Sequence, residues 1–297
     1  MIAILARNKA HTLPYFFAYL ERLDYPPNRI SLWIRSDHNV DNTVDVVKTW
    51  LDVHRNKYHS VDFSYEEEPE IFSDGPGVFE WSPYHFAHVI HLKETALKTA
   101  QQIWADYVMF LDCDVFLVNN NTLNLLIKQD KTLVAPVLET LGAYSNYWCG
   151  MTEQGYYKRT DNYLPILERE QIGCFDVPMI HSAVLINLRR KETAGVKMWV
   201  CNEEPFGYMM APLEKDNSLP DDREQLQNLK VEMLVEHPRV HISRSLSHFV
   251  PEQAEDTAGF DQVYLINLER RPERRVRMLG TLAELGIRAH ILAAVDG

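Results

Sequence analysis

The chain has 297 residues, of which 42 are acidic and 30 basic, giving a formal net charge of −12. This length allows one large domain or two modest ones with a well-buried core. The acidic balance argues against general binding to nucleic acid or to anionic lipid, because both require a basic surface. The charge does not exclude a nucleotide ligand, since a metal ion can supply positive charge locally. No run of about 18 apolar residues occurs, so we predict no transmembrane helix.

The first 140 residues alternate between strand and helix patterns. Apolar runs predict strands at 2–6, 30–34, 61–65, 107–111 and 132–137, and helical spacing predicts helices at 11–23, 44–53 and 84–105. Residues 66–83 are acidic and rich in Pro and Gly, which indicates a loop. Strands separated by helices form right-handed βαβ units. We therefore predict an α/β fold with a mostly parallel, Rossmann-type sheet flanked by helices.

The second half has weaker patterns. We expect a weakly periodic aromatic region at 143–169, a strand at 177–188, an irregular stretch at 191–220, a helix at 221–236 and a linker at 239–259. The pattern of residues 260–297 predicts a strand, a basic helix at 272–285 and a last strand. One βαβ unit cannot bury both faces of its strands. We therefore interpret 260–297 as the start of a truncated second α/β domain, following a first domain at 1–238.

The strongest chemical pattern is an apolar strand, Tyr107–Leu111, that runs directly into Asp112-Cys113-Asp114. Residues two apart on a strand point the same way, so the two carboxylates can converge on one cation. In α/β sheets the carboxyl ends of the strands face the ligand crevice. Oxygen ligands suit Mg²⁺ or Mn²⁺ on a diphosphate. The alternative is a solvated acidic turn.

Two other strand ends carry polar residues. Asp37 and Asp41 follow the second strand, where either could accept hydrogen bonds from a base or a ribose; the same residue types also build a plain Asx turn and helix N-cap. Arg7 and Asn8 follow the first strand, and Arg7 could stabilise a phosphate. Three strand ends that deliver polar groups to one edge together outline a nucleotide crevice.

Other candidates carry weaker patterns. Lys93 lies near the apolar stripe of the long helix, where it could reach a phosphate, although a snorkelling lysine is the favoured interpretation. His181 opens a strand and could contact the donor sugar or the metal, but a lone His there is more often structural. Asp176 is a candidate general base. The aromatic residues Tyr144, Tyr147, Trp148, Tyr156 and Tyr157 could form a sugar platform or simply pack.

Several segments carry a resemblance to a known family. They are Ile2–Pro14, Ser36–Thr43, Ala143–Thr152, Gly155–Thr160 and Val177–Ser182, and the match extends over nearly the whole chain. The chain is similar to the procollagen galactosyltransferases of glycosyltransferase family 25, which also includes a cerebral endothelial adhesion relative thought to lack the activity. The segment 260–297 resembles the opening of the family's second transferase domain. The resemblance implies a GT-A-like first domain.

The family's activity follows from the resemblance. It implies transfer of galactose, with inversion, from UDP-galactose to the hydroxylysine of collagen, with Mn²⁺, in the endoplasmic reticulum lumen. On that interpretation Asp112 and Asp114 match the metal and UDP motif, while Ala6–Asn8, Asp37 and Asp41 would hold the uridine. Inversion requires a general base on the acceptor hydroxyl and a cation on the leaving diphosphate. A homo-oligomer stays open, and Cys149 and Cys174 are a candidate disulfide in an oxidising lumen.

The sequence departs from the family in four places. From the resemblance we expect no signal peptide, no retention signal and only the beginning of the second domain. We also expect that a stretch with an Asp-Asp pair, which the family has after Lys191, is nearly absent. Two alternatives therefore stand beside the galactosyltransferase: an inactive transferase-like module that binds collagen or a partner, and a metal or sugar enzyme with a donor other than UDP.

Overall fold

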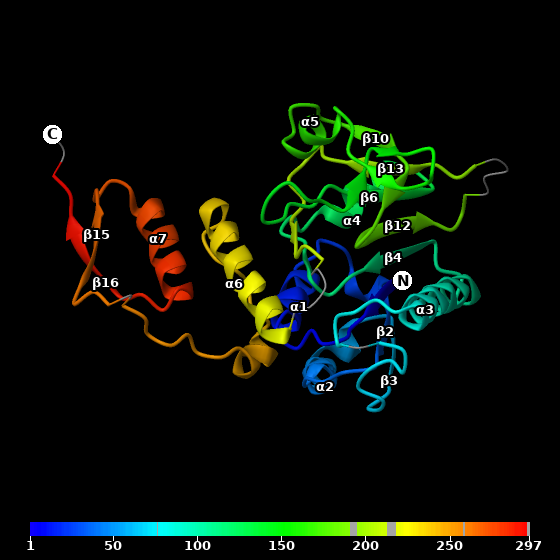
Figure 1. The fold of residues 1–297 in the computed structure, drawn as a ribbon, viewed down its shortest axis with the longest axis horizontal. Helices are drawn as coiled ribbons and strands as arrows, with labels where there is room; N and C mark the ends of the chain where they lie inside the picture. Colours follow the sequence, from blue (N-terminus) through cyan, green and yellow to red (C-terminus); the bar gives the residue numbers. More distant parts are fainter. Residues whose placement is uncertain (76, 191–194, 213–217, 258, 296–297) are drawn as a thin grey trace.

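A computed structural model describes residues 1–75, 77–190, 195–212, 218–257 and 259–295. Its centre is an eight-stranded sheet with the order β10-β13-β6-β12-β4-β1-β2-β3 (Figure 1). The strands are β1 (Ile2–Leu5), β2 (Ser31–Ser36), β3 (Ser60–Tyr65), β4 (Tyr107–Leu111), β6 (Leu133–Pro136), β10 (Cys174–Val177), β12 (Ala183–Asn187) and β13 (Met198–Cys201).

Most neighbouring strands in this sheet run in parallel. β1 pairs in parallel with β2 and β4, β2 with β3, and β6 with β13. β12 is inserted antiparallel between β4 and β6, and β10 closes the edge antiparallel to β13. The predicted α/β fold with a mostly parallel sheet is therefore confirmed. The reversal at β12 matters for the site, because it places the start of that strand beside the end of β4: Ala183 pairs with Leu111.

Helices cover both faces of the sheet (Figure 1). The helices are α1 (Leu13–Glu21), α2 (Thr43–His54), α3 (Pro83–Gln102), α4 (Thr122–Lys128), α5 (Tyr163–Leu167), α6 (Leu219–Glu236) and α7 (Pro272–Glu284). Side chains alternate across a strand, so Ile2 and Ile4 of β1 join the larger core with α1 and α2. Ala3, between them, packs on the other face with Ala96 and Ala100 of α3.

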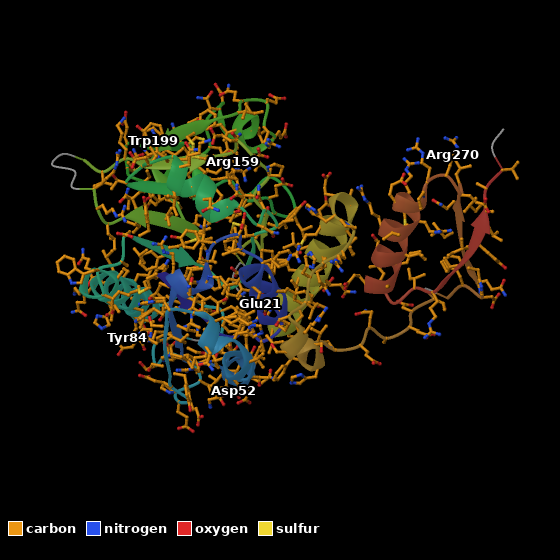
Figure 2. The ribbon with its side chains drawn as sticks, turned by 180° about the vertical axis from the view of Figure 1, so that it is seen from behind. Glu21, Asp52, Tyr84, Arg159, Trp199 and Arg270 are labelled. Atoms are coloured by element: carbon orange, nitrogen blue, oxygen red, sulfur yellow. A yellow bond between two sulfur atoms is a disulfide. The ribbon has the colours of Figure 1, made fainter. Side chains whose placement is uncertain are left out.

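Shorter elements flank the main sheet. They are β5 (Val115–Phe116) with β14 (Tyr208–Met209), β7 (Tyr147–Trp148) with β11 (Met179–Ile180), β8 (Gly150–Met151) with β9 (Tyr157–Lys158), and the 3₁₀ helices η1 (Pro27–Arg29), η2 (Arg55–Lys57) and η3 (Arg244–Phe249). The side chains fill the space between the helices and the sheet, with Glu21 of α1 near the middle of the main body and Asp52 of α2 at its lower edge (Figure 2).

The C-terminal residues form a small unit of their own. β15 (Val263–Asn267) and β16 (Ala289–Ala293) pair in parallel, with α7 as the connection between them (Figure 1). This is the βαβ unit that the sequence predicted. α7 packs along α6, where Nζ of Lys230 lies 2.6 Å from a carboxylate oxygen of Glu284. The unit joins the main body through this helix pair, and its strands stand apart from the eight-stranded sheet.

Three segments differ from the sequence predictions. The stretch 177–188, expected as one strand, is divided, because Ser182 has a left-handed backbone (φ 63°) between β11 and β12. The stretch 191–220, expected to be irregular, contains β13 of the main sheet and β14; its residues 191–194 and 213–217 lie outside the described part. The stretch 239–259, expected as a linker, contains η3, whose Leu246 is fully buried in the main core.

The cysteine pairing also differs from the expectation. Cys174 forms a disulfide with Cys201, whereas Cys149 is a free, half-buried thiol. The register of β10 against β13 explains this, because it places Cys174 directly opposite Cys201. Among the described residues, no helix combines the length and the apolar character needed to cross a membrane.

Candidate functional site

A pocket of about 470 Å³ lies where β1, β2 and β4 end and where β12 begins. The lining residues that the sequence had singled out are Ala6, Arg7, Asn8, Asp37, Lys93, Asp112, Asp114, Tyr144 and His181. Parallel strands bring their carboxyl ends to one edge, which is why residues so distant in the sequence meet there. The three strand ends predicted to share a crevice do share one.

The Asp112–Asp114 turn is held from three sides. The backbone N–H of Asp112 donates to the carbonyl of Ser182 at 2.8 Å, the Cys113 thiol donates to the carbonyl of Leu5 at 3.3 Å, and the carbonyl of Asp114 accepts from Met210. The turn is therefore fixed before any ligand binds. Burial raises the pKa of Asp112, nearby Lys93 lowers it, and the neighbouring Asp114 raises it further, so the net pKa is above its ordinary value.

Lys9 is a cation inside the pocket that the sequence analysis did not single out. Its Nζ lies 3.2 Å from a carboxylate oxygen of Asp114 and 2.9 Å from one of Asp222 on α6. Burial alone would lower the pKa of Lys9, but these two carboxylates outweigh it and raise the pKa above its usual value. Asp222 also lies 3.0 Å from Nε2 of His11. Lys9 directly follows Arg7-Asn8 in sequence, which was the available signal; Asp222 had none.

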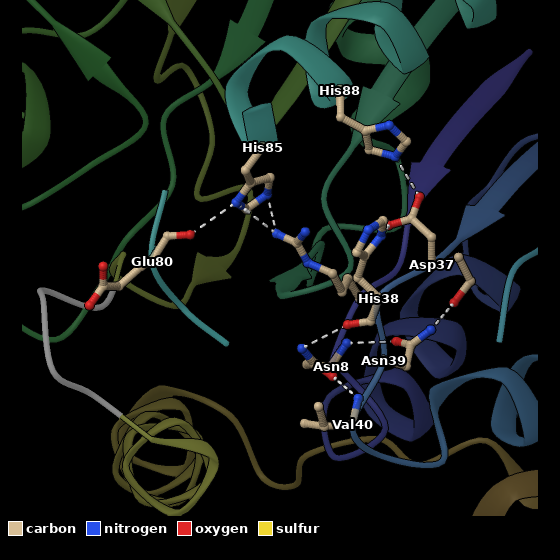
Figure 3. A network of polar contacts seen from close by, with 10 residues as sticks. Asn8, Asp37, His38, Asn39, Val40, Glu80, His85 and His88 are labelled. Atoms are coloured by element: carbon tan, nitrogen blue, oxygen red, sulfur yellow. Dashed lines mark hydrogen bonds and ion pairs between the residues drawn. The ribbon is translucent and has the colours of Figure 1, made fainter. Parts of the chain in front are cut away.

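Asp37 is held by two histidines at the end of β2 (Figure 3). Nδ1 of His38 lies 3.0 Å from Oδ1 of Asp37, and Nε2 of His88 on α3 lies 2.8 Å from Oδ2. Burial tends to raise the pKa of Asp37, but hydrogen bonds from the two imidazoles bring it below its ordinary value. Asp37 is therefore ionised at neutral pH and faces the pocket.

A stack of aromatic rings lies on this side of the pocket, where Trp81 and His85 line it. Trp81 stacks on His85 with centroids 4.0 Å apart, and Phe72 stacks on both His85 (4.7 Å) and His38 (3.8 Å). The Arg7 guanidinium contacts His85 and lies 4.9 Å from the Phe72 ring centroid. Burial lowers the pKa of Arg7 to about 10, partly opposed by Asp37, so Arg7 stays charged at neutral pH.

His181 joins a hydrogen-bonded chain on the opposite side. Its Nε2 lies 3.1 Å from the Tyr144 hydroxyl and its Nδ1 lies 2.7 Å from Oγ of Ser182. Burial, with a smaller contribution from Lys93, lowers the pKa of His181 to about 4, so the imidazole is neutral at pH 7. Of the aromatic residues considered as a sugar platform, Tyr144 lines the pocket, whereas Tyr147 is buried in a separate core cluster.

Two predicted site residues lie elsewhere. Asp41 caps the neighbouring turns: its Oδ2 accepts from the backbone N–H of Ala10 at 3.0 Å and its Oδ1 from that of Thr43 at 3.0 Å. Asp176 lies on the edge strand β10 and forms a solvent-exposed salt bridge of 2.6 Å with Lys197. Neither lines the pocket. The placement argues against a nucleotide contact for Asp41 and against Asp176 as the general base.

These observations define an α/β protein with a charged, preorganised pocket at the carboxyl edge of its sheet. The family model described as the N-terminal domain of glycosyltransferase family 25 matches residues 1–194 and 191–230. The chain belongs to glycosyltransferase family 25. The match consists of two segments, which overlap at residues 191–194.

Curated relatives match the whole chain. Procollagen galactosyltransferase 2 of Mus musculus is 44% identical, and inactive glycosyltransferase 25 family member 3 of Homo sapiens is 40% identical. The chain covers 52% and 54% of these two proteins, so it spans about half the length of the curated relatives that it matches. Among solved structures, mannosyltransferase PcManGT from Pyrobaculum calidifontis in complex with GDP-Man and Mn²⁺ aligns with a TM-score of 0.42 and 13% identity, over 79% of this chain and 62% of that one.

Proposed function

We propose that the pocket is the donor site of a galactosyltransferase that uses UDP-galactose and glycosylates hydroxylysine in collagen. The activity and the acceptor follow the name of the relatives, procollagen galactosyltransferase, whereas the donor follows from the family resemblance. The observation that carries the proposal is the meeting of Arg7, Asp37 and Asp112 at one pocket, from the ends of three neighbouring strands. This combination offers a cation for phosphate and carboxylates for a metal ion and for a nucleoside.

The site suits a divalent cation of the Mn²⁺ type. Asp112 and Asp114 offer hard oxygen ligands, and the ammonium of Lys9 already lies against Asp114, which indicates that a positive charge is favourable there. Asp112 and Asp114 would hold the ion. When bound, it would offset the negative charge of the diphosphate leaving group. The carboxylates themselves orient toward the pocket because the turn is fixed by Ser182 and Leu5.

The other lining residues are assigned to different parts of the donor. Ala6–Asn8 and Asp37 would face the nucleoside, with Asp37 accepting hydrogen bonds through its ionised carboxylate. Arg7 and Lys93 place positive charge in the pocket, where it would attract phosphate oxygens. His181 is a weak base because its pKa is about 4, so we assign it hydrogen bonding to the sugar rather than proton abstraction.

We also propose that the protein works in an oxidising compartment such as the endoplasmic reticulum lumen. The Cys174–Cys201 disulfide supports this, because disulfides persist in secretory compartments and are rare in the cytosol. The proposed macromolecular partner is a collagen-type acceptor.

Calorimetric binding of UDP to the chain, with and without Mn²⁺, tests the donor site. We expect Mn²⁺-dependent binding that is lost in the double variant Asp112→Asn/Asp114→Asn. Asp176→Asn is the matched control, since it removes a carboxylate on an exposed strand outside the pocket, and it should bind UDP as the unmodified protein does. Unchanged binding in the double variant would contradict the proposed metal site.

Transfer is tested separately from binding. The human relative named as inactive shows that family membership does not by itself establish turnover. The measurement is release of UDP from UDP-galactose in the presence of a hydroxylysine-containing collagen peptide. Metal-dependent UDP binding together with undetectable transfer would favour the alternative of a non-catalytic, collagen-binding module. Equal competition by GDP or CMP would contradict the uridine assignment.

A further inference from the structure

We propose that Asp37, His38 and His88 form a binding site for a transition metal ion of the Zn²⁺ type, distinct from the all-oxygen site at Asp112 and Asp114. One ligand atom from each residue lies within 4.8 Å of the other two. Two imidazoles aim ring nitrogens at the same carboxylate, at 3.0 Å and 2.8 Å (Figure 3). The inference concerns zinc binding alone and does not depend on the proposed function.

The chemistry of the three ligands determines the metal. Two nitrogens and one carboxylate suit Zn²⁺, whereas Mg²⁺ and Mn²⁺ favour oxygen ligands such as those at Asp112 and Asp114. Two ligands on a tetrahedral zinc ion lie about 3.4 Å apart, given bonds of about 2.1 Å. The widest ligand pair of the cluster, which lies within 4.8 Å, therefore needs to approach by at most about 1.4 Å. His88 can supply this movement, because its side chain is 26% exposed, the most accessible of the three.

The turn that carries two of the ligands is rigid. His38 has a left-handed backbone (φ 49°), a conformation that costs energy for a non-glycine residue and needs support from its surroundings. Asn8 supplies that support: its Nδ2 donates to the carbonyl of His38, and its Oδ1 accepts from the backbone N–H of Val40 at 2.7 Å. Asn39 ties the turn to β2 by donating to Oγ of Ser36 at 2.9 Å.

The His38 ring is held in place by an aromatic contact. It stacks on Phe72 with an interplanar angle of 12° and a centroid distance of 3.8 Å. Ligands fixed by surrounding contacts lose less entropy when an ion binds. Arg7 interacts with Asp37 and opposes a second positive charge, which limits the affinity that we expect.

The pocket supplies access for the ion. Asp37 and His88 both line it, so an ion with three protein ligands would keep an open position facing the cavity. If Asp37 also contacts the nucleoside, zinc and the nucleoside would exclude each other; that consequence alone rests on the proposed function. Zinc binding is therefore measured without nucleotide, so that its failure and the failure of the donor site are distinguishable.

The test is calorimetry with Zn²⁺ alone, on metal-stripped protein from which any affinity tag has been removed. We expect one high-affinity zinc site, with an affinity that falls at least about 100-fold in His88→Ala, because even residues that only support ligands contribute roughly 10–100-fold. Visible absorption with Co²⁺ as the probe should report nitrogen–oxygen coordination in the unmodified protein and should lose that signal in His88→Ala.

Two control variants make the result specific. His91→Ala removes an exposed histidine one turn further along α3 and should bind zinc unchanged. Asp112→Asn alters the oxygen site and should also leave zinc binding unchanged. No zinc binding by the folded protein overturns the proposal, and so does zinc binding that His88→Ala leaves intact or that Asp112→Asn abolishes. Circular dichroism of His88→Ala establishes that any loss is local.

Discussion

Nζ of Lys9 lies 3.2 Å from a carboxylate oxygen of Asp114, at the acidic turn that ends β4. The same ammonium contacts Asp222 of α6 at 2.9 Å, although Asp222 is 213 residues further along the chain. A single buried lysine therefore bridges two carboxylates and links the segment after β1 to α6. Without it, Asp114 and Asp222 would face each other as like charges in a buried place.

Replacing Lys9 by Met should destabilise the fold substantially. Removing one member of a buried ion pair leaves an uncompensated charge, which costs about 3 kcal/mol or more. We expect the free energy of unfolding in urea to fall by about that amount. The further change Asp222→Asn in the Lys9→Met background should recover part of the loss, because it removes one of the unpaired charges.

The control for this prediction is Lys98→Met. Lys98 pairs with Glu94 one turn away on α3, and both side chains are well exposed (69% and 59%). Exposed pairs of this spacing contribute only about 0.5 kcal/mol or less. Equal losses in Lys9→Met and Lys98→Met would mean that the contact with Asp114 and Asp222 has no special energetic role.

Gly207 is a second position where the pocket depends on one residue. A Cβ atom there would lie 2.0 Å from the carbonyl oxygen of Phe116, and its backbone has a φ of 153°. Gly207 precedes β14, which pairs with β5 directly after Asp114. We expect Gly207→Ala to destabilise the protein by about 3 kcal/mol or more, because backbone strain and a steric clash add.

Gly142→Ala separates the two causes. Gly142 also has a positive φ, of 100°, but a Cβ atom there would meet no heavy atom within 4 Å. We expect this variant to lose only about 1 kcal/mol from backbone strain. Thermal unfolding of both proteins measures the difference, and a loss in Gly142→Ala as large as that in Gly207→Ala would exclude the clash as the main cause.

The low pKa of His181 predicts a pH dependence of stability. In the folded protein its pKa is about 4, below the value of about 6.5 expected in the unfolded chain. The fold therefore retains the neutral imidazole, and its contribution is complete above about pH 6.5. As the pH falls toward 4 the unfolded chain takes up the proton first, so stability is lost over this window.

His181→Gln removes this titration. Between about pH 6 and pH 4.5, the free energy of unfolding should fall more steeply in the unmodified protein than in His181→Gln. The difference in slope should be up to about 1 kcal/mol per pH unit. Urea unfolding at several pH values measures both slopes. His91→Gln, which removes an exposed histidine, should keep the slope of the unmodified protein. Parallel curves for the unmodified protein and His181→Gln would show that His181 is not held neutral.

The sequence was sufficient to place the residues that follow strands. Arg7, Asp37 and Asp112 were identified because apolar runs mark the strands and because parallel strands end at one edge. Lys9 lies in the same segment but escaped notice, since an isolated lysine in a loop carries no pattern. His88 and Asp222 lie on helices, and their place in the pocket depends on how those helices pack over the sheet.

Two predicted site carboxylates, Asp41 and Asp176, lie outside the pocket for physical reasons. Asp41 forms an Asx-type turn before α2 with the same residue types that would contact a ribose, so composition alone could not distinguish the two roles. The position of Asp176 depends on β13, which lies in a segment that had no strand pattern. Because β13 belongs to the sheet, β10 is its outer strand. Asp176 therefore lies far from the strand ends that form the pocket.

The Cys174–Cys201 disulfide should stabilise the protein without influencing the donor site. It joins β10 to β13 at the edge of the sheet and closes a loop with a sequence separation of 27. A loop of this length corresponds to about 3 kcal/mol of stabilisation, because the crosslink restricts the unfolded chain. We expect Cys174→Ser/Cys201→Ser to lose about that much in urea unfolding.

UDP binding should be unchanged below the transition, since neither cysteine lines the pocket. Cys149→Ser, which changes a free thiol, is the control and should lose much less; a similar loss in both would place the effect in side-chain packing rather than in the crosslink.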